Sequence, residues 1–268
     1  MSTSARLSGT ALLDALERGE VRCAERGADG AWRVNAWVKE EILAVFRSSQ
    51  VVPMGLESAP CGAYLDKEPL APRRFEPAQG VRVVPGGSAV RRGAFLGRGV
   101  VVMPPAYVNI GAWVGEGTMV DSHALVGSCA QIGARCHISA AAQIGGVLEP
   151  ANARPVVVED DCFVGGNCGV YEGVLLRRGA VLASGVVLAS GVVVHDCVRG
   201  VELRGTREAP LEIPEGAVVV PGSRPLRPED PAARAFAEAR GLQVACALIV
   251  KYRDERTDRA TALEQALR

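Results

Sequence analysis

A short stretch near the middle of the chain gathers side chains that can move protons or attack electrophiles. Asp121 and His123 stand two residues apart, and Ser128 and Cys129 follow a few residues later. A serine or cysteine nucleophile needs a base beside it and a third group to orient that base, and no such relay is visible next to Ser128 or Cys129. The spacing therefore does not favour covalent catalysis by either residue.

The histidines and cysteines do not form a pattern that is typical of a metal site. The chain has three histidines, His123, His137 and His195, and none stands in an H-x4-H pair. We expect all three at exposed corners of the fold, with the alternative that His123, so close to Asp121, lines an active site. The eight cysteines are expected to be reduced thiols, because a chain of this size does not need disulfides.

Four basic residues lie close together near the C-terminal end: Lys251, Arg253, Arg256 and Arg259. Such a cluster can bind phosphate groups, and it can equally be a solvated turn between a strand and a helix. The sequence leaves both interpretations open.

The overall composition excludes several classes of partner. The chain has 268 residues, and its 30 Lys and Arg balance its 30 Asp and Glu, so it lacks the positive field that drives binding to nucleic acid. No apolar run approaches the roughly 20 residues that span a bilayer, and the first residues lack the apolar core of a signal peptide. We therefore expect a cytoplasmic protein that binds neither nucleic acid nor membranes.

A six-residue repeat dominates the sequence from position 90 onward. Aliphatic residues recur at every sixth position, first at Val90, Leu96, Val102, Val108, Val114, Val120, Val126, Ile132, Ile138 and Ile144. After an interruption at Leu148–Val157, which the prolines and Asn152 predict to be a loop, the period resumes at Val158, Val164, Val170, Leu176, Leu182, Leu188 and Val194. Small residues stand four positions after most of these, among them Cys136, Cys162 and Cys168, which we expect in the core.

A period of six fits neither a helix nor an isolated strand, whose periods are about 3.6 and 2. It predicts a mainly β fold, a triangular parallel β-helix in which each hexad forms a short strand and a corner, and three hexads close one coil. At 18 residues per coil, about 110 residues predict roughly six coils. The pattern alone does not give the hand of the coil.

The flanking regions lack the repeat. Apolar stripes at helical spacing predict short helices within Gly9–Arg26 and Val38–Ser48, before an irregular connection that leads to residue 80. Past the repeat, Pro228–Arg240 and Thr257–Arg268 are expected to be helices and Leu242–Tyr252 a strand.

The sequence thus predicts three parts. These are a small helical region at residues 1–80, a β-helix at residues 81–222, and a C-terminal helix, strand and helix at residues 223–268.

Several motifs carry a more specific resemblance. They are YVNIGAWVGEG at Tyr107–Gly117, TMVDSHALVGSCAQIG at Thr118–Gly133, IGGVLEP at Ile144–Pro150 and ALIVKY at Ala247–Tyr252. They resemble the tetrahydrodipicolinate N-succinyltransferase family of hexapeptide-repeat acyltransferases, and weaker similarity covers nearly the whole chain. The resemblance implies a left-handed parallel β-helix.

The resemblance also implies a reaction. Succinyl would move from succinyl-CoA to the amino group of ring-opened tetrahydrodipicolinate, L-2-amino-6-oxopimelate, in the diaminopimelate route to lysine, without a covalent enzyme intermediate. An amine that attacks a thioester needs a base for its proton, donors for the oxyanion and cations for a dicarboxylate. By the resemblance, Asp121 would orient or deprotonate the amine, Arg82 would bind a carboxylate and Ser128 would contact the substrate.

The chain departs from the family pattern at two site positions. His123 stands where many members have tryptophan, and Gly169 stands where the family has its second acid. Glu172 is retained, so either Glu172 takes a polar role at the mouth of the site or Asp121 acts alone. Each candidate also has a structural interpretation, which is a solvated corner for Asp121 and Glu172 and a surface ion pair for Arg82.

For the acyl-CoA, the resemblance implies a homotrimer with active sites between subunits and no metal ion. Small residues at successive corners, with Ala183 and Gly185 in the first, would let pantetheine approach the backbone, and Lys251 and Arg253 would face the phosphates. Three alternatives stay open: an acetyl-CoA-dependent enzyme, a γ-type carbonic anhydrase, whose zinc needs three imidazoles, and a non-catalytic hexapeptide scaffold.

Overall fold

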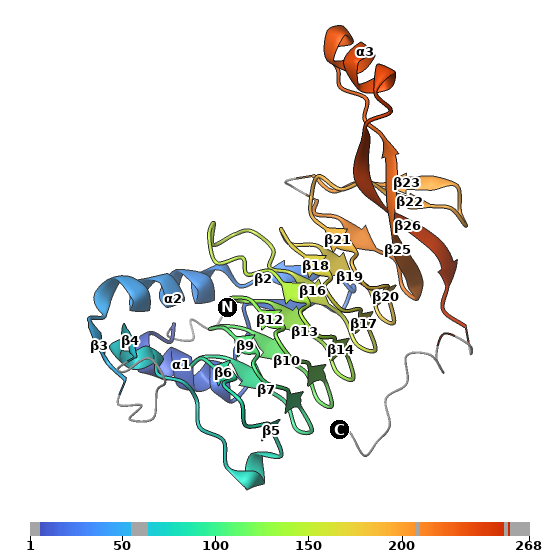
Figure 1. The fold of residues 1–268 in the computed structure, drawn as a ribbon. Helices are drawn as coiled ribbons and strands as arrows, with labels where there is room; N and C mark the ends of the chain where they lie inside the picture. The colour runs from blue at the N-terminus through green and yellow to red at the C-terminus, as the bar shows by residue number, and fades with distance from the viewer. Residues whose placement is uncertain (1–5, 55–63, 207–208, 255–256, 258–268) are drawn as a thin grey trace.

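The protein is described here by a computed structural model that covers residues 6–54, 64–206, 209–254 and 257 (Figure 1). Successive short strands belong in turn to three different parallel sheets, and each strand pairs with the strand three places later. Trp113, for example, pairs with Gln131, which lies 18 residues further along the chain. Each stretch of three strands and three corners, called a coil here, therefore gives one strand to each of the three sheets, as the repeat predicts.

The three sheets are named here by one strand of each. The β12 sheet contains β6 (Ala89–Val90), β9 (Tyr107–Val108), β12 (Leu125–Val126), β15 (Gln143–Ile144), β18 (Gly169–Val170) and β21 (Val187–Leu188). The β10 sheet contains β7 (Phe95–Leu96), β10 (Trp113–Val114), β13 (Gln131–Ile132), β16 (Val157–Val158), β19 (Leu175–Leu176) and β24 (Glu212–Ile213). The β11 sheet begins with β5 (Arg82–Val83), β8 (Val101–Val102), β11 (Met119–Val120), β14 (His137–Ile138), β17 (Phe163–Val164) and β20 (Val181–Leu182).

One apolar core lies inside the coils and explains the period of the sequence. The second residue of each two-residue strand points inward, and the aliphatic series from Val90 to Leu188 is buried with the small residues that follow it. Cys136, Cys162 and Cys168 lie in this core, as expected, where they act as compact apolar side chains. The predicted loop at Leu148–Val157 is confirmed between β15 and β16, except that its last residue, Val157, already belongs to β16.

The N-terminal region packs beside the first coils (Figure 1). Its elements are α1 (Gly9–Glu17), β1 (Ala24–Arg26), β2 (Trp32–Val34), α2 (Ala36–Ser48), β3 (Val51–Pro53), β4 (Leu65–Lys67) and two 3-10 turns, Glu68–Leu70 and Pro77–Gln79. Both predicted helices are confirmed, and their apolar stripes form a second core with Ile110 and Cys129 of the coils.

Lys39 of α2 is completely buried and binds the loop at Leu148–Val157. Its Nζ donates hydrogen bonds to the carbonyl oxygens of Pro150, at 3.2 Å, and Ala153, at 2.8 Å. Burial lowers the pKa of Lys39. The N-terminal region is thereby joined to that loop.

At the other end the repeat gives way to longer strands. The β11 sheet continues through β25 (Ala217–Pro225), β26 (Gln243–Tyr252), β22 (Val194–Asp196) and β23 (Val201–Leu203), and α3 (Pro231–Ala239) lies at the tip of the β25–β26 hairpin. The expected helix and strand at Pro228–Arg240 and Leu242–Tyr252 are confirmed in these elements, whereas the predicted helix at Thr257–Arg268 falls almost entirely outside the described residues. No helix in the described part of the chain is long and apolar enough to cross a membrane.

One predicted hexad, at Val194, does not continue the alternation of strands among the three sheets. Val194 is buried in the core, yet its strand, β22, pairs with β26 and β23 instead of continuing the β10 sheet. Glu212–Ile213 takes the place beside β19. The predicted boundary between residues 222 and 223 falls inside β25, which is continuous from Ala217 to Pro225.

Candidate functional site

The corners of the coils stack into three edges, and the candidate residues lie on them. The Asp121 edge is made of the corners that lead from the β11 sheet to the β12 sheet, and the Glu172 edge leads from the β12 sheet to the β10 sheet. The third edge, named here after Arg178, leads from the β10 sheet back to the β11 sheet.

Asp121 is positioned by the end of β11 and faces a histidine from the next coil. Its Oδ1 accepts a hydrogen bond of 2.7 Å from the backbone N–H of Ser122, and its Oδ2 lies 3.6 Å from Nε2 of His137. His137 is on β14, directly beside Met119 of β11, and its ring meets Phe163 edge-on at 5.0 Å between centroids. A carboxylate and an imidazole are thus held together on a rigid sheet.

This location corrects the expectation for His137. It lies on a strand and only 12% of its side chain is exposed, because the outer face of the β11 sheet is crowded by neighbouring side chains. His195 is also on a strand, β22, with Nδ1 3.3 Å from Glu202. His123 is at an exposed corner with φ of +61°, as expected.

A buried hydroxyl adds to the polar character of this edge. Ser139 stands at the corner position equivalent to Asp121 one coil further on, and Ser139 is 9% exposed. Among the described residues its Oγ has no hydrogen-bond partner. A buried polar atom without a partner is costly, so this hydroxyl is a candidate contact for a ligand beside Asp121.

Arg82 lies on the outer face of the same sheet as Asp121. It is the first residue of β5, which is separated from β11 only by β8. At the strand spacing of a sheet, β5 and β11 are roughly 10 Å apart. That separation suits a substrate whose amine and distant carboxylate are held by one chain.

Glu172 occupies a different edge and lines a cavity of about 810 Å³. Its φ of +52° is unusual for a residue with a side chain. The hydroxyl and the backbone N–H of Ser190 both donate hydrogen bonds to Glu172 Oε2, the latter at 2.9 Å. These bonds stabilise the charged form and lower the pKa of Glu172.

Tyr171 covers the position of the acid that the chain lacks. A Cβ built on Gly169 would lie 2.5 Å from the Tyr171 ring and 2.9 Å from its hydroxyl oxygen. A side chain at position 169 would therefore need Tyr171 to move. Tyr171 lines the same cavity as Glu172.

The structure does not bring Asp121 and Glu172 together within one chain. The full width of the β12 sheet separates their two edges. Ser128 is on the Glu172 edge, two coils before Glu172, where its carbonyl accepts a hydrogen bond of 3.1 Å from the N–H of Val147. The predicted residues thus fall into two groups, Asp121 with Arg82 and Glu172 with Ser128.

Ala183 and Gly185 join the first of these groups. They form the corner after β20, three coils beyond Asp121 on the same edge, or about 14 Å away at the spacing of parallel strands. Gly185 has a φ of +80°, and no atom lies within 4 Å of a Cβ built on it, so its backbone faces open space.

Lys251, at the end of β26, and Arg253, just after it, already have partners. Nζ of Lys251 lies 3.2 Å from Asp254, and the Arg253 guanidinium donates to the carbonyl oxygens of Asp161, at 2.8 Å, and Gly179, at 3.3 Å. These carbonyls are on the Arg178 edge, across the β11 sheet from Ala183 and Gly185. Arg256 and Arg259 lie outside the described residues.

Sequence reasoning missed His137, Ser139 and Ser190. All three follow from counting one coil of 18 residues from a recognised position, since 137, 139 and 190 are Met119, Asp121 and Glu172 plus 18. In the described part of the chain, no group of three or more His, Cys, Asp or Glu side chains is arranged to hold a metal ion.

Comparisons with known proteins place this architecture in a family. Residues 3–48 match the family described as the N-terminal region of tetrahydrodipicolinate N-succinyltransferase, and residues 155–190 match the hexapeptide repeat of succinyl-transferase. A solved structure from Campylobacter jejuni, provisionally assigned as a 2,3,4,5-tetrahydropyridine-2-carboxylate N-succinyltransferase, superimposes with a TM-score of 0.53. It is 16% identical, the match covers 96% of this chain and 65% of that one, and it supports the fold alone.

Curated relatives are much closer in sequence. The protein named 2,3,4,5-tetrahydropyridine-2,6-dicarboxylate N-succinyltransferase in Rhodopseudomonas palustris strain BisA53 is 48% identical over 262 residues, which is 96% of this chain and 87% of the relative. The protein of the same name in Nitrobacter winogradskyi is 47% identical over 263 residues, with the same coverage. The chain therefore belongs to the tetrahydrodipicolinate N-succinyltransferase family.

Proposed function

We propose that this protein is the acyl-CoA-dependent transferase that its relatives are named for. It moves a succinyl group from succinyl-CoA to the amino nitrogen of L-2-amino-6-oxopimelate, the ring-opened form of tetrahydrodipicolinate, in the diaminopimelate route to lysine. The observation that carries the proposal is identity of 48% maintained along 96% of the chain.

Asp121 is the proposed base. The amine nitrogen attacks the thioester carbonyl carbon, its proton passes to the Asp121 carboxylate, and the C–S bond then breaks to release CoA. His137, 3.6 Å from Asp121 Oδ2, keeps the carboxylate in one orientation. Arg82 binds a carboxylate of the substrate from the same sheet face.

The Asp121 edge is the proposed track for acyl-CoA. With the thioester at Asp121, the pantetheine arm runs along the edge towards Ala183 and Gly185, where small corners leave the backbone accessible. Lys251 is the remaining candidate for a phosphate, because its Nζ is partly exposed, whereas Arg253 already binds two carbonyl oxygens.

We also propose the handedness of the coil and the way in which the chains associate. The three sheets close into a left-handed coil, which the hexapeptide-repeat match over residues 155–190 supports. Three chains associate so that the Asp121 edge of one faces the Glu172 edge of its neighbour, and Glu172 and Ser128 then contribute to the site of the neighbouring chain. The separation of these two groups within one chain supports this arrangement.

The division into parts at residues 80 and 222, the cytoplasmic location and the expectation that no metal ion takes part stay predictions from the sequence.

A direct assay tests the function. Purified protein is supplied with the amino-oxopimelate and either succinyl-CoA or acetyl-CoA, and loss of thioester absorbance is followed. We expect turnover with succinyl-CoA that is abolished by Asp121→Asn and retained by Asp29→Asn, a matched change in an exposed turn. Preference for acetyl-CoA would contradict the succinyl assignment, and unchanged turnover by Asp121→Asn would contradict the proposed base.

A further inference from the structure

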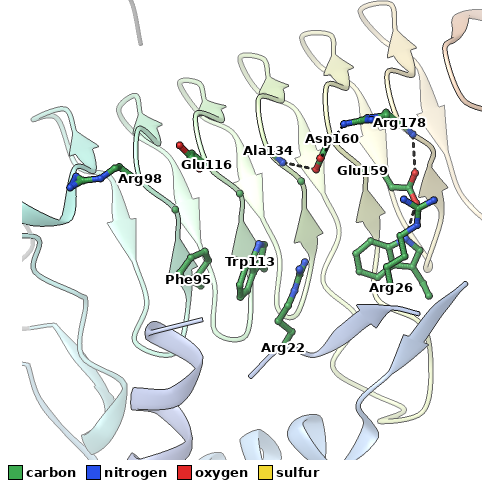
Figure 2. A pocket seen from close by; sticks show the side chains of 14 residues that line it. Arg22, Arg26, Phe95, Arg98, Trp113, Glu116, Ala134, Glu159, Asp160 and Arg178 are labelled. Atoms are coloured by element: carbon green, nitrogen blue, oxygen red, sulfur yellow. Dashed lines mark hydrogen bonds and ion pairs between the residues drawn. The ribbon is translucent and has the colours of Figure 1, made fainter. Parts of the chain in front are cut away.

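A cavity of about 570 Å³ lies away from every residue proposed for catalysis, between the β1–β2 hairpin and the outer face of the β10 sheet. Figure 2 shows its side chains, with Phe95 and Trp113 side by side on the sheet and Arg22 reaching in from the N-terminal region. The backbone of Gly115 and Gly133 also lines it. A cavity of this volume is large enough for a small organic molecule.

The Arg22 guanidinium lies close to two aromatic rings. Its Cζ lies 3.9 Å from the centroid of Trp113 and 5.6 Å from that of Trp32. The far side of Trp113 stacks on Phe95, at 3.9 Å between centroids and 28° between planes. The guanidinium thus lies over aromatic rings, and its N–H groups donate hydrogen bonds in its own plane.

One edge of the guanidinium is already fixed. Nε donates a hydrogen bond of 2.9 Å to Oε1 of Gln131, whose side chain is 1% exposed. The Gln131 amide nitrogen donates in turn to the carbonyl oxygens of Cys129, at 2.9 Å, and Gly111, at 3.3 Å. Gln131 therefore fixes Arg22 through Nε and leaves the two terminal nitrogens available to a ligand in the cavity that Arg22 lines.

No acid of the described residues forms an ion pair with Arg22, although the charges of Glu25 and Asp160 act on it from further away and oppose the effect of burial on its pKa. Three acidic residues line the wall. Glu159 accepts from Trp32 Nε1 at 2.9 Å and from the N–H of Arg178 at 3.0 Å, Asp160 accepts from the N–H of Ala134 at 2.9 Å, and Glu116 is exposed at the rim. No carboxylate lies within 4.0 Å of an Arg22 nitrogen in the described ranges. Burial lowers the pKa of Arg22 to about 10, so the group is still charged at neutral pH.

A largely buried cation that lacks a counter-ion is costly, and a carboxylate in the plane of the guanidinium would remove that cost through two parallel hydrogen bonds. We propose that this cavity is a binding site for a small organic carboxylate, held by Arg22 between Trp113 and Trp32. The ligand also joins the N-terminal hairpin to the sheet, because Arg22 and Trp32 belong to the first and Trp113 to the second. The proposal goes beyond the transferase reaction and does not depend on it.

The intrinsic fluorescence of the protein reports on this site. Trp32 and Trp113 are two of only three tryptophans in the chain. The intact protein is titrated with benzoate and with succinate as carboxylate probes, and with benzamide as the uncharged match to benzoate. We expect a saturable fluorescence change with at least one carboxylate and none with benzamide. No saturable change with either carboxylate, or an equal change with benzamide, would overturn the proposal.

Substitutions of Arg22 test whether it binds the carboxylate. Arg22→Gln is expected to weaken carboxylate binding at least tenfold, and Arg22→Lys is expected to weaken it less, because a lysine keeps the charge but not the fork. Arg18→Gln, an exposed arginine paired with Glu20, serves as the control and should bind as the wild type does. Unchanged affinity in Arg22→Gln would contradict the assignment.

A crystallographic measurement is independent of whether the variants fold. Crystals of the wild-type protein soaked in p-bromobenzoate should give an anomalous bromine peak in the cavity of Figure 2, with the carboxylate on Arg22. Peaks found only elsewhere on the protein would overturn the proposal.

Discussion

Oδ2 of Asp121 lies 3.6 Å from Nε2 of His137, where Asp121 directly follows β11 and His137 is on β14, the neighbour of β11 in the sheet. One coil of chain separates the two residues, and the pairing of β11 with β14 fixes their relative position without a loop. His137 is further confined by Phe163, against which its ring packs edge-on.

His137→Gln should therefore lower kcat more than it changes KM. Loss of the imidazole removes the group that faces Oδ2 of Asp121 and leaves the carboxylate held only through Oδ1, and we expect kcat to fall about tenfold, which is the effect of roughly 1.4 kcal/mol on a barrier. Steady-state kinetics with saturating succinyl-CoA measure the change. His195→Gln, an equivalent change in an end strand, should leave kcat intact; equal loss in both variants would show that His137 only stabilises the fold.

Mixing two inactive variants tests whether sites form between subunits. Asp121→Asn and Glu172→Gln should each be impaired, since they remove groups proposed to face one site from different chains. When equal amounts are unfolded and refolded together, about one quarter of the sites in random trimers combine an intact Asp121 with an intact Glu172. Activity should recover to about that fraction of wild type, provided that each variant alone refolds to a trimer by light scattering. No recovery would place both acids in a single-chain site.

The hydrogen bonds from Ser190 predict a pH effect. They lower the pKa of Glu172, so Ser190→Ala should raise that pKa towards its ordinary value. If the ionised carboxylate is required, the acid limb of the kcat/KM profile should move to higher pH in the variant. Ser223→Ala, at an exposed position of β25, is the matched control. An acid limb at the same pH in wild type and Ser190→Ala would mean that Glu172 ionisation does not limit the reaction.

Tyr252 and Asp196 predict a pH-dependent contribution to stability. The Tyr252 hydroxyl donates to Asp196 Oδ2 at 2.5 Å, and burial together with this bond raises the Tyr252 pKa to about 12. Tyr252→Phe should lower the free energy of unfolding by about 1–2 kcal/mol near neutral pH.

The sign of the pH effect follows from the raised pKa. The stabilisation by Tyr252 is fully present below its ordinary pKa of 10.0 and is lost as the pH rises towards about 12, so the gap between wild type and Tyr252→Phe should narrow over that range. Urea unfolding at neutral and alkaline pH measures it. Tyr107→Phe, at an exposed outer position, should show neither effect.

The coils were predictable because their cause is local. Each aliphatic residue of the hexad faces the core whatever its neighbours do, so ten uninterrupted repeats suffice to identify the architecture. Val194 shows the limit of this reasoning. It satisfies the period and is buried, but whether its strand continues a sheet depends on which later segment competes for the same edge, and Glu212–Ile213 takes that place.

The candidate site was predictable only in part. Asp121 and Arg82 were identified from motifs, whereas His137 became visible as a partner only when the coil placed it beside Met119. The Arg22 cavity could not be anticipated, since it depends on how a separate hairpin docks on Phe95 and Trp113. Which residues are neighbours in adjacent coils can be predicted by counting 18 positions along the sequence. Contacts between the coils and a separate segment, such as the β1–β2 hairpin, cannot be predicted in this way.

Because the strands of neighbouring coils are evenly spaced, distances along the Asp121 edge come in steps of one strand spacing. Three steps of strand spacing separate Asp121 from Ala183, so under the proposed function the distance between the reacting carbon and the small corners is set by the number of coils and by no individual side chain. Insertion of one whole coil between them would lengthen the track by about 4.8 Å and keep every inward residue in place. Under the proposed function, a chain with one coil more or fewer between these corners would suit a carrier arm that is longer or shorter by that one step.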